Sequence, residues 1–149
     1  MRNVERDFGI ARSILKRVRH LMDRAVGEAL ISRYRQYEQL FPKTEAKDRH
    51  VAAAAVAARR RYRVAVVTIV TWNLKDFDRD ELAKAGTVAK NPDEFLCHLL
   101  TNSPEPVVTA FMRMRDNLRN PPKTTQECAN TLAAQGLKKF ARMLLARIT

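Results

Sequence analysis

The stretch VAVVTIVTWNLKDFD, residues 64–78, is the most informative segment for the fold. Residues 64–71 are apolar or Thr without a two-residue alternation, which is typical of a strand covered on both faces in a parallel sheet. Thr71, Asn73 and Asp76 follow at its end. Such sheets place ligands beyond the carboxyl ends of their strands. The segment therefore indicates either a plain strand and turn, or a strand that presents a binding group.

A helix is expected directly before this strand, over DRHVAAAAVAARRRYR, residues 48–63. Alanine has the highest helix propensity, and its small side chain lets a helix approach a sheet closely. Asp48 stands at the helix start, where a carboxylate can cap free amide groups. On position alone we favour this capping role for Asp48 over a catalytic one. The helix closes in a basic cluster, Arg59, Arg60 and Arg61.

Short elements are expected after the strand. Residues 78–86, DRDELAKAG, predict a helix that Gly86 stops. TVAK, residues 87–90, predicts a brief strand, and Asn91 is placed as the N-cap of the next helix, with Pro92 as its first residue. Helices alternating with strands predict an α/β layer with a parallel sheet.

The two ends of the chain read as helical. ARSILKRVRHLMD, residues 11–23, predicts a basic amphipathic helix, for which a solvated outer face is favoured over an RNA contact. EALIS, residues 28–32, is a candidate short strand. The last helical segment follows Gly136, and docking on the domain's own core is favoured over partner binding for it. Its apolar face comprises Leu137, Phe140, Ala141, Leu144, Leu145 and Ile148.

Composition favours a soluble globular protein with a polyanionic partner. The 149 residues are 46% hydrophobic and 30% charged, and the formal net charge is +12, which favours RNA or DNA over an acidic membrane surface. Cys97 and Cys128 form no C-x-x-C pair, so neither a zinc site nor a disulfide framework is indicated. The sequence opens with no signal peptide and contains no apolar run of membrane-spanning length. The expected location is the cytoplasm.

Several linked motifs together resemble the PIN-domain family, which includes the VapC-type toxins of bacterial toxin–antitoxin pairs. The similarity is to a bacterial PIN subfamily with a helical C-terminal extension, and it runs over nearly the whole chain. The motifs are KDRHVAAAA at 47–55, VTWNLKDF at 70–77, NPDEFL at 91–96 and NPPKTTQECANTLAAQGL at 120–137.

The resemblance implies an α/β/α sandwich with a parallel sheet and Mg²⁺- or Mn²⁺-dependent hydrolysis of RNA. By position, Asp48 and Asp76 match metal-binding catalytic acids, while Thr71 and Asn73 match polar residues at the strand end. Hard divalent cations take such oxygen ligands. The implied partners are RNA and an antitoxin protein. By charge, we also expect Arg59, Arg60 and Arg61 to bind RNA.

The chain also departs from the family pattern. The match begins after the family's first strand, which carries an Asp, and after a helix that carries a Glu. We therefore expect a partial PIN-like domain over residues 1–101 that lacks the first strand, and a helical C-terminal extension over 102–149. Since that strand is central, its loss would expose apolar surface of the sheet. A stable fold then requires either that the strands rearrange or that a second chain, as in a homo-oligomer, covers the gap.

Three interpretations remain open at this point. The first is a metal-dependent ribonuclease of toxin–antitoxin type, or a truncated form of one. The second is a catalytically inactive remnant that binds nucleic acid or a protein partner. The third is a misplaced start, with a full nuclease as the true protein. Two acids alone fix a metal poorly, so the chain as given is expected to be a weak nuclease.

Overall fold

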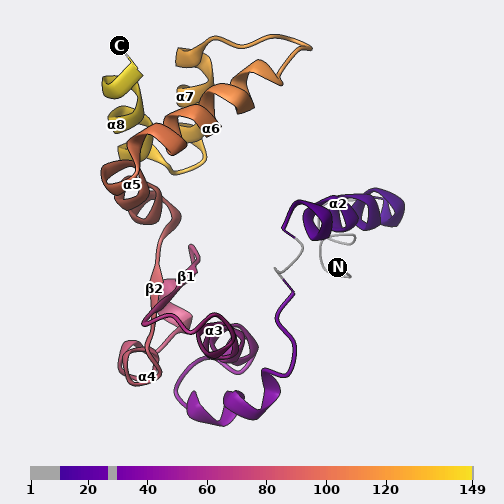
Figure 1. Ribbon diagram of the computed structural model, residues 1–149, viewed down its shortest axis with the longest axis vertical. Helices are drawn as coiled ribbons and strands as arrows, with labels where there is room; N and C mark the ends of the chain where they lie inside the picture. The colour runs from indigo at the N-terminus through magenta and orange to yellow at the C-terminus, as the bar shows by residue number, and fades with distance from the viewer. Residues whose placement is uncertain (1–10, 27–29, 149) are drawn as a thin grey trace.

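The computed structural model describes residues 11–26 and 30–148. Two hydrophobic cores organise them, one built around a helix and a small sheet and the other around four helices. Figure 1 shows the elements along the chain. They are α2 (Arg12–Ala25), η1 (Arg35–Leu40), α3 (Arg49–Tyr62), β1 (Val67–Val70), η2 (Leu74–Asp76), α4 (Arg79–Lys84), β2 (Thr87–Lys90), α5 (Pro92–Asn102), α6 (Pro104–Asp116), α7 (Thr125–Ala134) and α8 (Lys138–Ile148).

The sheet consists of β1 and β2, which pair in parallel. Val67 lies opposite Thr87, and Val70 lies opposite Lys90. The helix α4 connects the two strands, and Gly86 follows it with a φ of +69°. This left-handed conformation suits glycine, which has no Cβ to clash. The parallel pairing, the strand over 87–90 and a helix stopped by Gly86, which follows the C-cap of α4, are confirmed.

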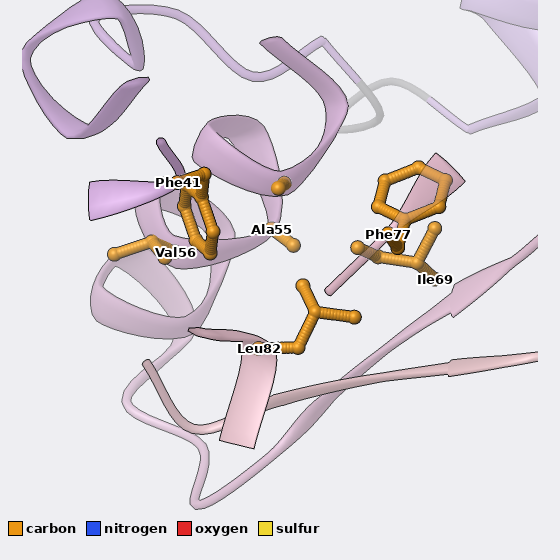
Figure 2. Packing of buried hydrophobic residues seen from close by; sticks show 7 residues of the cluster. Phe41, Ala55, Val56, Ile69, Phe77 and Leu82 are labelled. Carbon is orange, nitrogen blue, oxygen red and sulfur yellow. The ribbon is translucent and has the colours of Figure 1, made fainter. Parts of the chain in front are cut away.

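The first core lies between α3 and the sheet. Ala52, Ala55 and Val56 of α3 are buried, and Ile69 of β1 and Leu82 of α4 belong to the same cluster (Figure 2). Phe41 joins them from the segment before α3 and is fully buried. Small alanine side chains let the helix lie close to the strand, as the sequence predicts.

The strand β1 is covered on one face only in the described part of the chain. It spans four residues, and among them only Ile69 is buried. Val66 and Val70 are 54% and 44% exposed. The prediction of a strand over 64–71 buried on both faces is therefore wrong, because the described helices cover one side of the sheet. The α/β character is present, while the three-layer α/β/α sandwich stays a prediction.

The amphipathic helix near the amino terminus is confirmed as α2, which lies apart from the sheet in Figure 1. Its apolar stripe is exposed at Ile14, Val18, Leu21 and Met22. The candidate strand over 28–32 is not found at residues 30–32, and residues 28 and 29 lie outside the described part.

The second core is formed by α5, α6, α7 and α8. Its buried residues are Cys97, Leu100, Phe111, Cys128, Phe140 and Leu144. Asn91 caps α5, since its side chain accepts the Glu94 N–H at 2.8 Å. Phe140, Ala141 and Leu144 of α8 are buried, so docking of the last helix on the protein's own core is confirmed. Both cysteines are buried and free.

The packing groups α5 with the three helices that follow it. Cys97 and Leu100 of α5 belong to the second core, whereas the predicted domain boundary falls between residues 101 and 102. Trp72, just after β1, lies close to the turn between α7 and α8, since a Cβ added to Gly136 would lie 3.0 Å from the Trp72 indole ring. The domain boundary between residues 101 and 102 stays a prediction.

No helix in the described ranges is both long and apolar enough to span a bilayer.

Candidate functional site

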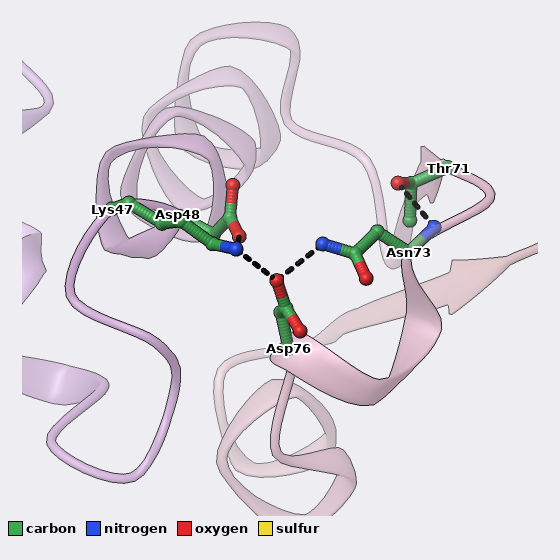
Figure 3. A network of polar contacts seen from close by, with 5 residues as sticks. All are labelled: Lys47, Asp48, Thr71, Asn73 and Asp76. Carbon is green, nitrogen blue, oxygen red and sulfur yellow. Dashed lines mark hydrogen bonds and ion pairs between the residues drawn. The ribbon is translucent and has the colours of Figure 1, made fainter.

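Asp76 lies in η2, the short helical turn that follows β1, and its side chain is only 7% exposed. The ammonium of Lys47 lies 2.7 Å from Asp76 Oδ2. The side-chain amide of Asn73 donates a hydrogen bond to the same oxygen (Figure 3). Chiefly because of the Lys47 hydrogen bond, and also that from Asn73, the pKa of Asp76 is lowered from its usual value. Asp76 is therefore a carboxylate held in its ionised form.

Asp48 faces the same position from the start of α3. Its Oδ2 atom is buried without a hydrogen-bond partner and lies 4.0 Å from the Lys47 Nζ atom. The predicted capping role is wrong, because the Asp48 side chain makes no hydrogen bond to the first amides of α3. The reason is its backbone, which is helical (φ −109°, ψ −5°), whereas a capping residue usually has extended geometry. We call Asp48 and Asp76 the acid pair.

Thr71 and Asn73 shape the turn that carries Asp76. The Thr71 hydroxyl accepts the Asn73 N–H at 3.1 Å. The Thr71 N–H donates to the Lys90 carbonyl at 3.0 Å, which extends the pairing of the two strands by one residue. Asn73 then directs its side-chain amide at Asp76. Asn73 therefore orients the Asp76 carboxylate directly, and Thr71 fixes the turn that carries Asn73.

The segment that carries Lys47 is fixed to α4 by one carboxylate. Glu81 accepts the backbone N–H groups of Lys43 and Thr44 at 2.7 and 3.0 Å, and the Thr44 hydroxyl at 3.1 Å. Thr44 is buried, and its hydroxyl also accepts the Asp78 N–H at 3.3 Å. A buried backbone turn needs such partners for its polar groups. Glu81 therefore holds the segment in place beside the acid pair.

The same segment is also tied to α3 and to η2. The Arg49 guanidinium donates to the carbonyls of Pro42 and Thr44 at 2.8 and 3.0 Å. The Glu45 N–H donates to the Asp76 carbonyl at 2.9 Å. These bonds join two stretches far apart in sequence, and so the acid pair is held together by backbone contacts as well as by Lys47.

The basic cluster lies at the other end of α3 from Asp48. At a rise of about 1.5 Å per residue, the helix separates Asp48 from Arg60 by about 18 Å. All three arginines have local partners. Arg60 lies over the Tyr37 ring, 4.9 Å from its centroid, and Arg61 donates to the Leu30 carbonyl at 3.2 Å. The structure thus brings Asp48, Asp76, Thr71 and Asn73 together but does not bring the arginines to them.

Arg59 has a structural position. Its Nε atom donates to the Ala65 carbonyl at 2.9 Å. Its side chain also passes beneath Gly86, where an added Cβ would lie 2.5 Å from the Arg59 Nε atom. Arg59 therefore fixes the turn between α3 and β1 to the turn before β2.

The acid pair suits a divalent cation with few protein ligands. Two carboxylates point at one position, which a positive group already occupies, and one Asp48 oxygen lacks a hydrogen-bond partner. Mg²⁺ is usually bound by one or two carboxylates, with water and phosphate oxygens completing its shell. Within the described ranges, no group of three or more His, Cys, Asp or Glu side chains could hold a metal. The fit is therefore to a two-carboxylate site.

Lys47 is the residue of this cluster that sequence reasoning missed. It belongs to the motif that begins at residue 47, directly before Asp48, but a lysine in a chain this basic carries little signal. The adjacent opposite charges at the start of a helix were the only hint. The contact with Asp76 depends on the tertiary structure, which places η2 next to this segment.

In a comparison with known families, residues 92–146 match the VapC50 C-terminal domain. This range corresponds to α5 through α8. Comparison with curated proteins and with solved structures gives no match. The matched part is less than half of the chain and suggests a VapC-related family.

Proposed function

We propose that the protein is a PIN-type, divalent-metal-dependent endoribonuclease of a toxin–antitoxin pair. The observation that carries this proposal is the convergence of Asp48 and Asp76 on one cation position at the carboxyl end of a strand in a parallel sheet. The match of residues 92–146 to the VapC50 C-terminal domain supports the toxin–antitoxin assignment. The PIN-like motifs in the sequence agree with the acid pair and with the VapC50 match.

The residues of the site have separate roles in this proposal. Asp48 and Asp76 provide oxygen ligands for Mg²⁺ or Mn²⁺. A bound divalent cation supplies an activated water and offsets the charge that develops on a phosphate. Asn73 fixes the orientation of the Asp76 carboxylate, and Thr71 fixes the turn that carries Asn73. A site held in this way keeps the two acids at a constant separation.

The substrate proposed for this site is RNA. A net charge of +12 favours a polyanion, since each neutralised phosphate releases counterions. Arg60 and Arg61 offer positive charge at the far end of α3, and a bound strand would have to span about 18 Å to reach both them and Asp48. The proposal includes an antitoxin protein as partner and the cytoplasm as location.

A second candidate function is RNA binding without cleavage. The observation that favours it is the Lys47 ammonium, which already neutralises the buried Asp76 carboxylate. A carboxylate paired in this way needs no metal for its stability. The two functions make the same prediction for RNA binding and opposite predictions for metal-dependent cleavage.

The proposed nuclease can be tested with a fluorogenic single-stranded RNA in the presence of Mn²⁺. Wild type should cleave it, and Asp48→Asn and Asp76→Asn should each reduce cleavage by at least about 10²-fold, since a metal displaced by about 1 Å already has such an effect. Asp80→Asn is the matched control, because Asp80 is an exposed acid on α4 outside the cluster. Cleavage that survives both substitutions would contradict the proposal. RNA binding without any Mn²⁺-dependent cleavage would support the second function.

A further inference from the structure

The Lys47 ammonium occupies the position between the two acids. Its Nζ atom lies 2.7 Å from Asp76 Oδ2 and 4.0 Å from Asp48 Oδ2. Divalent cations such as Mg²⁺ and Ca²⁺ lie about 2.0–2.6 Å from their oxygen ligands. A cation bound by these two oxygens would therefore need the space that the ammonium fills. The two positive groups would also repel each other at such short range.

The members of the cluster differ in how easily they can move. Asp76 is buried, and Asn73 as well as the backbone contact to Glu45 hold it in place. The side chain of Lys47 is 67% exposed and carries its charge on a flexible four-carbon stem. Glu81 fixes the backbone before Lys47. Rotation of the exposed Lys47 side chain alone is therefore enough to turn the ammonium towards solvent.

We propose that Lys47 is a tethered competitor for the divalent cation, which binds the acid pair only after the ammonium has left. The inference rests on the proposed function, in which the acid pair is the metal site. Lys47 offsets one of the two negative charges of the acid pair in the metal-free protein and lowers the affinity of the site for metal. Lys47 is thus a regulatory residue of the site and not a ligand.

Mn²⁺ binding measured by calorimetry and by the electron paramagnetic resonance of free Mn²⁺ tests this without an activity assay. Lys47→Met should bind Mn²⁺ about 5-fold more tightly than wild type, which is the scale of one exposed ion pair. Lys47→Arg should bind no more tightly than wild type, because it keeps the positive charge. Lys75→Met is the matched control: Lys75 is an exposed lysine next to Asp76 for which the structure gives no ion pair with a described acid. It should leave the affinity within about 2-fold of wild type.

The outcomes separate this inference from the proposed function. Equal Mn²⁺ affinity of wild type and Lys47→Met, or weaker binding by Lys47→Met, would overturn the role of Lys47 and leave the metal site standing. An absence of Mn²⁺ binding in all four proteins would overturn the metal site itself. Asp76→Asn should abolish binding in both the wild-type and the Lys47→Met background. NMR gives a second readout: Mg²⁺ should shift the Lys47 ε-methylene signal to the position of a free lysine, and the Lys75 signal should stay unchanged.

Discussion

Asp93 joins two helices that are far apart in sequence, and its removal should destabilise the second core. Its carboxylate accepts the backbone N–H groups of Lys139 and Phe140 at 3.1 and 2.8 Å. Since α8 begins at Lys138, these are amides of the first turn, which have no partner within the helix. Asp93, in the first turn of α5, therefore acts as the cap of α8.

The magnitude follows from the two hydrogen bonds. Replacing a capping residue by Ala costs about 0.5–2 kcal/mol, and a hydrogen bond to a charged group contributes about 1.5–3 kcal/mol. Asp93 is half-buried, so water replaces part of the lost contact. We expect Asp93→Ala to lower the free energy of unfolding by about 2 kcal/mol. At about 2–4 °C per kcal/mol for a chain of this length, Tm should fall by about 4–8 °C.

The measurement is thermal and urea unfolding followed by circular dichroism, with Glu94→Ala as the matched control. Glu94 is an exposed acid in the same turn of α5, so both substitutions remove one negative charge near the helix start. Only Asp93→Ala removes the contact with α8. Asp93→Asn, which keeps an oxygen acceptor without the charge, should fall between the two. Equal destabilisation by Asp93→Ala and Glu94→Ala would refute the reasoning, because the loss would then come from the α5 dipole alone.

Two further predictions concern the helices that form the second core. Gly136→Ala should destabilise the protein by at least about 1–2 kcal/mol, because Gly136 has a φ of +96° and an added Cβ would contact the Trp72 ring. The fluorescence of Trp72, the single tryptophan, should report the displaced indole. An unchanged emission spectrum would contradict the contact. The pKa of Glu127 is lowered, chiefly by the hydrogen bond from the Thr124 N–H and next by that from the Thr124 hydroxyl. The contribution of Glu127 to stability is therefore complete above the usual pKa of 4.5 and is lost as the pH falls through the lowered value. In urea unfolding across this pH range, the free energy of unfolding should depend less on pH for Glu127→Gln than for wild type.

Local signals in the sequence predicted several helix ends correctly, whereas the strand expected over 64–71 is shorter, Val67–Val70. Asn91 with Pro92, Gly86 and Gly136 each mark an end that the structure confirms. These residues act through their own backbone conformation or through an amide three residues away, so neighbouring residues suffice to identify them.

Neither the burial of the strand faces nor the partners of the acidic side chains could be predicted from neighbouring residues. A run of β-branched residues is compatible with cover on one face or on two, and the outcome for β1 depends on which helices reach it. The same holds for Asp48 and Asp93. Both stand at the start of a helix, where an acid usually stabilises that helix, yet Asp48 faces Lys47 and Asp93 caps α8. Their roles are decided by residues distant in the sequence.

Each hydrophobic core is formed by one continuous stretch of the sequence, and the two stretches do not overlap. The first draws its residues from Tyr37 to Ala89, and the second from Leu96 to Ile148. Each core can therefore nucleate from its own stretch of chain, with modest entropy lost in closing its loops. During synthesis, the first core is complete in sequence before the second has left the ribosome. The first core can therefore form without any residue of the second, so the described part of the chain can fold in sequence order from residue 37 towards the carboxyl end.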